Sequence, residues 1–270
     1  MKPTKSIYIL LSLFLIFSCE DNSVEPIVCD ERSSNWGGVM VVHDGECVCD
    51  EGYTEIDEEC YYQSDLDVLQ DIIDINESLS GEEPLEIGSQ LWVDGRLDSL
   101  SLRQIQLTTL PESIGDLSSL KLLDLSYNQL TTLPESIGNL SSLRWLYLED
   151  SQLTTLPESI GNLSSLYWLR LSSNQLTTLP ESIGNLSNLG SLELQNNQLT
   201  SIPESIGDLS SLEGLYLFNN QLTILPESIC NLRETCNIII YNNQLCEEYH
   251  YDCIDDYEWG EQECGDCCDE

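Results

Sequence analysis

Aliphatic side chains recur along the chain with a strict period of 23 residues. A Leu-Pro or Ile-Pro pair begins at residues 110, 133, 156, 179, 202 and 225, without one insertion or deletion. Within a period, Leu123 and Leu125 alternate with polar residues, which is typical of a short strand with one buried face. A fixed period of this length predicts a solenoid in which the strands of successive repeats stack in parallel.

The polar positions of a repeat have structural explanations of their own. Asn128 and its equivalents follow the strand, where a buried amide can satisfy backbone groups that a turn leaves unpaired. Ile105 and Ser151 interrupt this series, so we expect local loosening there. Pro134 and Glu135 suit the start of a short helical segment on the convex side. The same position carries six glutamates, which we attribute to helix starts, with cation binding as the alternative: Glu112, Glu135, Glu158, Glu181, Glu204 and Glu227.

Both ends of the array need a cover, because stacking leaves the first and last repeats open. Apolar residues between 64 and 79 follow helical spacing behind a Ser64/Asp65 cap, so we expect an amphipathic helix there. With Trp92 as a plug of the core, residues 63–96 form the predicted N-terminal cap. The repeats then run over 97–248, and residues 249–270 form an acidic, cysteine-rich C-terminal cap or tail.

The N-terminus has the layout of an export signal. Lys2 and Lys5 precede an apolar run over residues 7–17, and Ser18 and Cys19 follow it. A basic region, an apolar region and small residues in this order are typical of a signal peptide. The run has eleven residues, against the roughly 20 that a membrane-spanning helix needs. Ordinary cleavage and full secretion remain the alternative to an anchored protein.

The charge balance narrows the choice of partners. The chain carries 48 acidic and 9 basic side chains, a formal net charge of −39. Nucleic-acid affinity depends mainly on Lys and Arg that neutralise phosphates, so nucleic acid is excluded as a partner. We interpret the acidity as a means of solubility and self-repulsion rather than as a specific cation site.

The twelve cysteines lie at the two ends of the chain, with none in the repeats between, which indicates an oxidising compartment. At the C-terminal end we predict the pairs Cys230–Cys236 and Cys246–Cys253. Cys264, Cys267 and Cys268 have no predicted partners, and although their spacing could suit zinc, we favour disulfides and predict no metal or cofactor.

Catalysis has little support in the sequence. The chain has only two histidines, His43 and His250, and neither lies in a recognisable motif, so a histidine-dependent triad is not supported. Glycine-rich phosphate loops are also missing from the sequence. We therefore predict a protein that is not an enzyme.

The complete unit over residues 120–140 resembles the leucine-rich repeat, in the 23-residue class with Leu-Pro-x-x-Ile-Gly-Asn-Leu. This class occurs in Ras-suppressor-like and Scribble-like proteins and in many bacterial proteins. The resemblance implies an α/β solenoid: an arc with a parallel concave β-sheet, short convex helical or 3-10 segments and, here, cysteine-rich caps. It further implies recognition of protein or glycan ligands on a curved scaffold.

Two shorter resemblances concern the N-terminal part. Residues 15–19 resemble the lipobox of bacterial lipoproteins, which implies a signal peptide over 1–18, acylation of Cys19, a linker over 19–28 and attachment to the bacterial outer membrane or cell surface. Residues 29–62 resemble part of an epidermal-growth-factor-like module, with four cysteines rather than six. That resemblance implies the pairs Cys29–Cys47 and Cys49–Cys60 and suggests a spacer above the membrane.

The exposed strand positions of the concave face give the candidate binding residues. The repeat itself needs no aromatic side chain at these positions, and Trp, Tyr and Arg dominate binding hot spots. Trp145 and Trp168 should be neighbours about 5 Å apart on adjacent strands. The alternative is that the aromatic rings only pack on one another. The candidate ligand-binding residues are Trp145, Tyr147, Trp168, Arg170, Glu193, Tyr216, Phe218 and Tyr241.

These observations together predict a monomeric, non-catalytic surface lipoprotein that binds a protein or glycan ligand through its concave face. A structural envelope protein that depends on cations is the alternative from another functional class.

Overall fold

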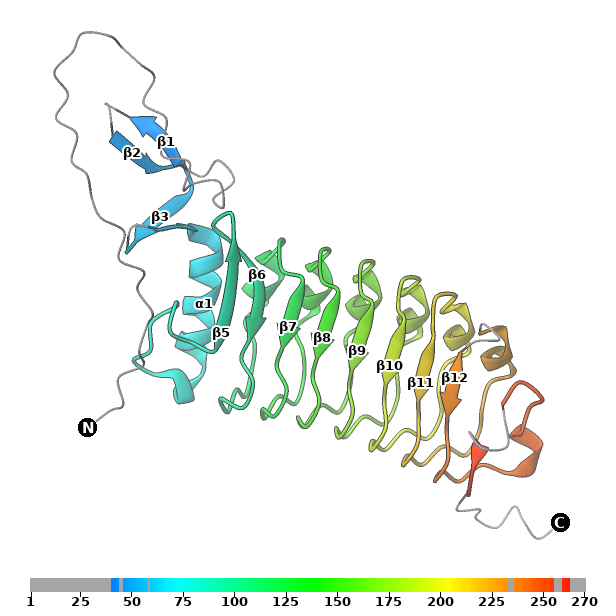
Figure 1. Cartoon of the computed structure of the whole chain (residues 1–270). Helices are drawn as coiled ribbons and strands as arrows, with labels where there is room; N and C mark the ends of the chain where they lie inside the picture. Colours follow the sequence, from blue (N-terminus) through cyan, green and yellow to red (C-terminus); the bar gives the residue numbers. More distant parts are fainter. Residues whose placement is uncertain (1–39, 44–45, 58, 233–235, 255–258, 263–270) are drawn as a thin grey trace, which may run out of the picture.

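The computed structural model describes residues 40–43, 46–57, 59–232, 236–254 and 259–262. Its main feature is one eight-stranded sheet in which the strands follow one another in chain order, so that the repeats form an elongated array (Figure 1). The strands are β5 (Ser89–Val93), β6 (Arg96–Ser101), β7 (Leu122–Asp124), β8 (Trp145–Tyr147), β9 (Trp168–Arg170), β10 (Ser191–Glu193), β11 (Gly214–Tyr216) and β12 (Asn237–Ile239).

Strands β6 to β12 are parallel, and each pairs with the next in a register of one repeat, as in Leu123↔Leu146. The predicted parallel stack is therefore confirmed. The N-terminal cap adds one strand to it, because β5 pairs antiparallel with β6.

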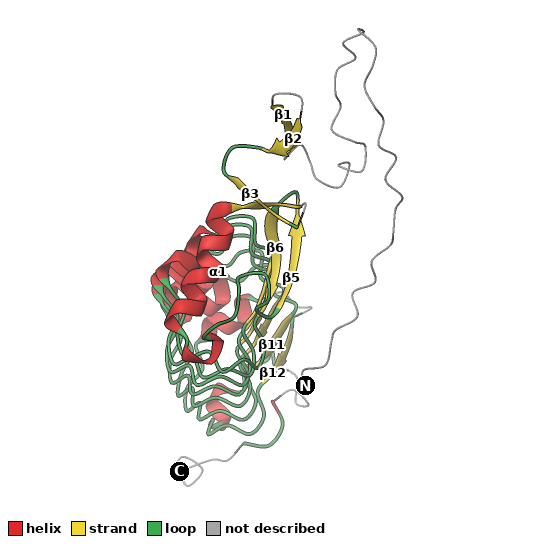
Figure 2. Ribbon diagram, turned by 90° about the vertical axis from the view of Figure 1, so that its left-hand side faces the viewer, coloured by secondary structure: helices red, strands yellow, loops and turns green. Residues whose placement is uncertain are grey.

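The opposite side of each repeat carries a short 3-10 segment, so the molecule has a sheet on one side and helical turns on the other (Figure 2). Leu123 and Leu125 from the strand and Ile137 and Leu140 from the convex side have no exposed surface, and together they fill the space between these layers. The convex segments are η3 (Glu112–Asp116), η4 (Glu135–Asn139), η5 (Glu158–Asn162), η6 (Glu181–Asn185), η7 (Glu204–Asp208) and η8 (Glu227–Asn231).

A glycine in each of η3 to η7 allows the convex segments to stack closely. A Cβ atom on Gly138 would lie 2.3 Å from the carbonyl oxygen of Ser159 in the next repeat. No side chain fits into that gap, so the glycine of the repeat is required by the close approach of the neighbouring backbone.

The asparagines that follow the strands form a buried ladder. Asn128 donates from Nδ2 to the carbonyls of Leu102 and Leu125 at 2.8 and 2.7 Å, and its Oδ1 accepts the Leu107 N–H at 2.9 Å. Ser151 takes the same position one repeat later, and its buried hydroxyl has no hydrogen-bond partner among the described residues.

Helix α1 (Gln63–Ile75) covers the first repeat, and the 3-10 turn η2 (Glu77–Leu79) follows it. The predicted helix is therefore present but ends earlier than residue 79. The expected Ser64/Asp65 cap is wrong: the N-cap residue is Tyr62, without a side-chain cap hydrogen bond. Asp65 instead lies buried inside the helix and pairs with Arg96, at 2.9 Å from its Nε.

Trp92 lies on β5 and is partly buried against the core. Its ring and that of Tyr61 form a T-shaped, edge-to-face contact with centroids 4.9 Å apart. Its Nε1 donates a hydrogen bond to Gln90 Oε1 at 2.9 Å. It thus covers part of the end of the core rather than filling its interior.

Two hairpins precede α1: β1 (Met40–His43) with β2 (Glu46–Cys49), and β3 (Tyr53–Ile56) with β4 (Glu59–Tyr62). A disulfide joins Cys49 to Cys60, the pair that the resemblance implied; Cys29 lies outside the described residues. The second hairpin rests on the cap, since the Tyr62 N–H donates to the Gly95 carbonyl at 2.7 Å. A Cβ on Gly95, whose φ is +70°, would lie 2.7 Å from the Cys60 carbonyl oxygen.

The C-terminal cysteines correct our prediction. Cys230 pairs with Cys253, so the predicted pairs Cys230–Cys236 and Cys246–Cys253 are both wrong, although Cys246 is also in a disulfide. Cys230 occupies the glycine position of η8, the last of the stacked convex segments, and it is exposed; Cys236 is buried directly before β12. The segment after η9 (Glu247–Tyr249) returns to Cys230, and there Ile254 and Trp259 are buried. Cys264, Cys267 and Cys268 lie outside the described residues.

Candidate functional site

The predicted concave residues fall into three columns with the period of the repeat: positions 145 and 168; positions 147, 170, 193 and 216; and positions 218 and 241, in a third column that also contains positions 103 and 149. Trp145 pairs with Trp168, Tyr147 with Arg170, and Arg170 in turn with Glu193. Since side chains alternate along a strand, the flanking leucines point into the core and these residues point out of it. The expected adjacency of the aromatic positions on β8 and β9 is thus present.

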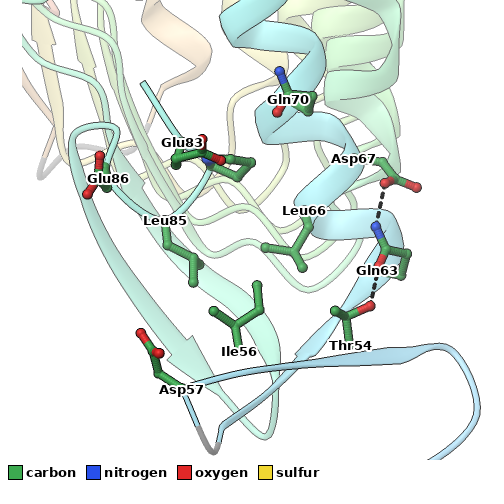
Figure 3. A pocket seen from close by; sticks show the side chains of 11 residues that line it. Thr54, Ile56, Asp57, Gln63, Leu66, Asp67, Gln70, Glu83, Leu85 and Glu86 are labelled. Carbon is green, nitrogen blue, oxygen red and sulfur yellow. Dashed lines mark hydrogen bonds between the residues drawn. The ribbon is translucent and has the colours of Figure 1, made fainter. Parts of the chain in front are cut away.

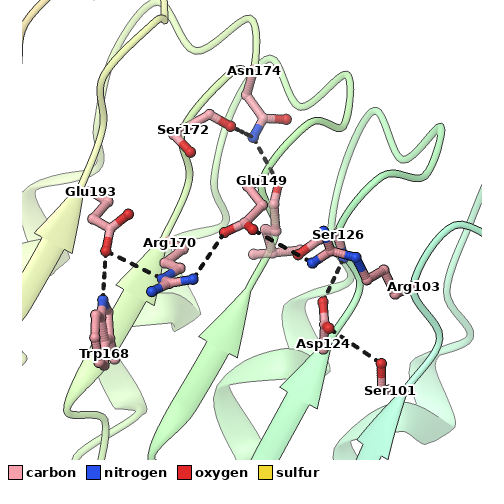
Figure 4. Close-up of polar contacts among 11 residues, drawn as sticks. Ser101, Arg103, Asp124, Ser126, Glu149, Trp168, Arg170, Ser172, Asn174 and Glu193 are labelled. Carbon is pink, nitrogen blue, oxygen red and sulfur yellow. Dashed lines mark hydrogen bonds and ion pairs between the residues drawn. The ribbon is translucent and has the colours of Figure 1, made fainter. Parts of the chain in front are cut away.

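Arg170 is the centre of a charged network on this face (Figure 4). Its guanidinium lies 3.2 Å from a carboxylate oxygen of Glu193 and 3.7 Å from one of Glu149, and Glu149 also pairs with Arg103 at 3.7 Å. Trp168 Nε1 donates to the same Glu193 oxygen at 2.8 Å. We call Arg103, Tyr147, Glu149, Trp168, Arg170 and Glu193 the concave network.

The rings of the concave network hold Arg170 from two sides. Its guanidinium carbon lies 4.6 Å from the ring centre of Trp168 and 4.9 Å from that of Tyr147. A guanidinium over an aromatic face is attracted by the ring quadrupole. Arg103 and Glu149 were not among the predicted binding residues, although both occupy the third exposed column, so their position in the repeat was enough to find them.

Burial in this network raises the pKa of two of its titratable groups, Glu149 and Tyr147. Burial raises the pKa of Glu149, and Arg170 and Arg103 only partly offset this effect. The pKa of the Tyr147 hydroxyl is likewise raised, mainly by burial, against the lowering effect of Arg170. The network is therefore a partly dehydrated surface in which charges of both signs are already paired and oriented.

Trp145 pairs with Trp168 across β8 and β9 but is not part of the concave network. It lines a hollow of about 620 Å³ at the start of the strands, together with Arg144, Ser165, Tyr167, Asn188, Ser211 and Glu213. Tyr167, which is 44% exposed, was missed because it lies one position before the columns that we compared. Other repeats carry Lys121, Arg144 and Glu213 at the same position. The presence of an aromatic ring among these charged residues is the sequence signal that would have identified Tyr167.

A second aromatic group lies nearer the C-terminal end. Phe218 and Tyr241 are stacked, with centroids 4.9 Å apart and planes at 15°. Tyr216 lies close to Gly214 of its own strand, where a Cβ would meet the ring at 2.9 Å. The structure thus brings Phe218 and Tyr241 together on the concave face.

The glutamate column on the convex side has a structural explanation. Carboxylate oxygens of Glu112 and Glu135 accept the N–H groups of Ser136 and Ser159 in the following repeat, both at 3.3 Å. Within the described ranges, no three His, Cys, Asp or Glu side chains gather as they would around a metal ion. The helices of these ranges are also too short or too polar to cross a membrane.

A further hollow, of about 570 Å³, lies in the N-terminal cap between the β3–β4 hairpin, α1 and the loop around Pro84 (Figure 3). Ile56, Leu66 and Leu85 form apolar parts of its wall. Gln63 accepts from the Thr54 hydroxyl and donates to Asp67 at 2.6 Å, so the polar groups at one side are paired with each other.

Comparisons with protein families agree with the geometry. The model for a leucine-rich repeat region matches residues 135–197. Two models for the leucine-rich repeat match residues 95–153 and residues 188–209 and 211–232, respectively. No curated protein matches the chain.

Solved structures give the same result. A leucine-rich-repeat protein of Leptospira interrogans is 38% identical with a TM-score of 0.53, over 55% of this chain and 38% of that one. The ectodomain of the receptor kinase GASSHO1/SCHENGEN3 from Arabidopsis thaliana, in complex with CASPARIAN STRIP INTEGRITY FACTOR 2, is 40% identical with a TM-score of 0.51, over 55% and 19%. A plant ice-binding protein is 26% identical with a TM-score of 0.57, over 68% and 65%.

The chain thus spans well under half the length of the first two of these proteins. Proteins with this fold are typically non-catalytic scaffolds that bind other proteins, and the disulfides of the chain indicate an oxidising, secreted environment. Between residues 95 and 232, the chain is an array of leucine-rich repeats that folds as a solenoid.

Proposed function

We propose that this protein is a non-catalytic, monomeric surface lipoprotein that binds a protein or glycan ligand through the concave face of its repeat array. One observation carries the proposal: the concave network places Trp168, Arg170 and Tyr147 on the open side of the sheet, at positions where the repeat requires no such residues. Trp, Tyr and Arg in rigid, partly dehydrated surroundings are the residues that contribute most to binding energy.

The network also lowers the entropic cost of binding. Arg170 is held by two carboxylates and two rings before any ligand arrives, so few rotamers remain to be fixed on association. The Arabidopsis ectodomain, which is in complex with a protein factor, supports a protein as the ligand of the network.

The test is capture from surface extracts by the full chain and by two variants. The double change Trp168→Ala with Arg170→Ala removes the centre of the network, and we expect it to abolish capture of the specific ligand while the melting temperature changes little. Ile224→Ala is the control, because Ile224 is an exposed large apolar residue that lies beside the convex segments rather than on the concave face. Equal capture by the wild type and the double variant would contradict the proposal.

The anchor is a separate part of the proposal. Residues 1–18 would be the signal peptide, Cys19 the acylated residue, 19–28 a linker and 29–62 an epidermal-growth-factor-like module before the cap of 63–96, the repeats of 97–248 and the tail of 249–270. The lipobox-like sequence and the Cys49–Cys60 disulfide support this division. Two or more acyl chains give stable attachment to a membrane, here the bacterial outer membrane or cell surface.

Fractionation of cells tests the anchor. The wild type should remain with the membranes, whereas Cys19→Ala should move to the soluble fraction. Ser18→Ala, one residue away, serves as the control and should stay with the membranes. Full membrane association of the Cys19→Ala variant would overturn the anchor and leave the concave site unaffected.

A further inference from the structure

The hollow that Trp145 lines differs from the concave network in both position and chemistry. It lies where strands β8 to β11 begin, and Arg144, Trp145, Ser165, Tyr167, Asn188, Ser211 and Glu213 surround its volume of about 620 Å³. This volume falls within the range of about 300–1,000 Å³ that is usual for small-molecule sites. We propose that this hollow is a second binding site, whose ligand is a neutral saccharide.

Tyr167 is the main platform of the site. Its ring lies against Gly190 of the next repeat, where a Cβ atom would come within 2.4 Å of Cε2 and 2.7 Å of Cζ. Other repeats carry Lys121, Arg144 and Glu213 at the position of Gly190. The glycine therefore makes room for the tyrosine ring, which stays 44% exposed and is held in place before a ligand binds.

Polar groups of both kinds surround this platform. Asn188 donates from Nδ2 to the Ser164 carbonyl at 2.7 Å, which fixes the amide and leaves its Oδ1 as an acceptor. The hydroxyls of Ser165 and Ser211 can donate and accept, Arg144 only donates, and the Glu213 carboxylate only accepts. Sugar hydroxyls, which also donate and accept, match such a set.

The lining of this hollow combines hydroxyl and amide groups with two aromatic rings, whereas the concave network consists of charged side chains and rings. The electron-rich faces of Tyr167 and Trp145 suit the C–H groups on the flat face of a pyranose ring, which carry partial positive charge. Aromatic faces beside hydroxyl-binding groups are the combination that a saccharide can use on both its apolar and its polar sides.

Charge supports a neutral ligand. Arg144 and Glu213 balance each other within the lining, although the chain as a whole has a formal net charge of −39. Anionic polymers would be repelled by the rest of the surface, and cationic ones would be drawn to the acidic convex side rather than to this balanced hollow. An uncharged oligosaccharide or polysaccharide is neither repelled by the acidic surface nor drawn to the convex side.

Native electrophoresis of the full chain through gels that contain soluble starch, hydroxyethylcellulose, galactomannan or a linear β-1,3-glucan tests the site. We expect at least one of these neutral polysaccharides to retard the wild type, and Tyr167→Ala and Trp145→Ala each to weaken retardation at least tenfold. Tyr127→Ala, which removes an equally exposed tyrosine elsewhere, should migrate like the wild type.

Gly190→Glu is the sharpest variant, because Glu213 already occupies the same position in the next repeat. The fold should accept it, with an unchanged melting temperature, while the new side chain displaces the ring of Tyr167 and abolishes retardation. Failure of all four polysaccharides to retard the wild type would overturn the proposal, as would equal retardation of the wild type and Tyr167→Ala, or binding of a random peptide library by the hollow in place of any saccharide.

The outcome is independent of the concave network. The Trp168→Ala/Arg170→Ala variant should lose capture of its ligand and keep its retardation by polysaccharide. A failure of one site is thereby distinguished from a failure of the other.

Discussion

Ser151 shows what one residue contributes to the asparagine ladder. In the next repeat, Asn174 accepts the Leu153 N–H at 3.0 Å and donates to the carbonyls of Leu148 and Leu171. The shorter side chain of Ser151 makes no such contact among the described residues, and its hydroxyl is buried without a partner. The sequence predicted local loosening at this point, and the hydrogen bonds that Ser151 does not make are a physical reason to expect it.

Ser151→Asn should therefore raise the free energy of unfolding by about 1–2 kcal/mol, since the new amide could make the backbone hydrogen bonds that Asn174 makes one repeat later. Urea denaturation followed by circular dichroism measures the change. The reverse substitution Asn174→Ser is the matched control and should lower stability by at least as much. A less stable Ser151→Asn variant would show that the ladder position cannot hold an amide there.

Glu149 makes stability depend on pH in a direction that its environment fixes. Because burial raises its pKa above the ordinary value of 4.5, the folded state retains this proton at pH values where the unfolded state has lost it. Stability from this group is therefore highest at low pH and falls as pH rises through the window above 4.5.

Glu149→Gln removes this titration and leaves the other groups in place. We expect the wild type to lose stability relative to the variant as the pH rises above the ordinary glutamate pKa of 4.5, as measured by denaturant titrations of both proteins at each pH. Comparing the two proteins cancels the titration of the many other carboxylates. The free energies of unfolding of the two proteins could instead differ by the same amount at every pH, or the wild type could gain stability as the pH rises. Either result would mean that the effect of Arg170 and Arg103 on the pKa of Glu149 is at least as large as that of burial.

At the scale of elements, Asp65 ties the cap helix to the repeats. Its carboxylate receives hydrogen bonds from Arg96 Nε and from the Leu97 N–H, both at 2.9 Å, and its side chain is 1% exposed. Helix α1 and strand β6 are thus joined by one buried acid, which the sequence pattern had assigned to the helix start.

Asp65→Asn should lower the free energy of unfolding by about 2–4 kcal/mol, because breaking a buried ion pair leaves its partner without compensation. Asp67→Asn on the exposed side of the same helix is the control and should change stability by less than about 0.5 kcal/mol. Thermal and urea melts compare the two variants. Equal effects would mean that Asp65 does not join α1 to the array.

Strands and convex turns were predictable because successive repeats are alike and stack with a fixed period. The pair Cys230–Cys253 could also have been predicted, because its two cysteines are 23 residues apart, which is one repeat period. For the same reason the sequence placed Trp145 beside Trp168 correctly but could not show that Trp145 lines a different hollow with Tyr167.

On the scale of the whole molecule, the concave face differs from the rest of an acidic chain. Of the 9 basic side chains in the sequence, Arg103 and Arg170 both lie in the concave network, where they pair with Glu149 and Glu193. The convex side presents the glutamate column instead. The two sides therefore offer a partner very different surfaces, and we expect the ligand of the concave network to bind on the concave side and not on the convex side.

Site-specific photo-crosslinking tests that claim most directly. The full chain would carry benzoylphenylalanine either in place of Tyr216 on the concave strand β11 or in place of exposed Glu158 on the convex segment η5, and each form would be irradiated with surface extract. The account predicts a discrete crosslinked species from position 216 and none from position 158. Crosslinks from position 158 alone would contradict it.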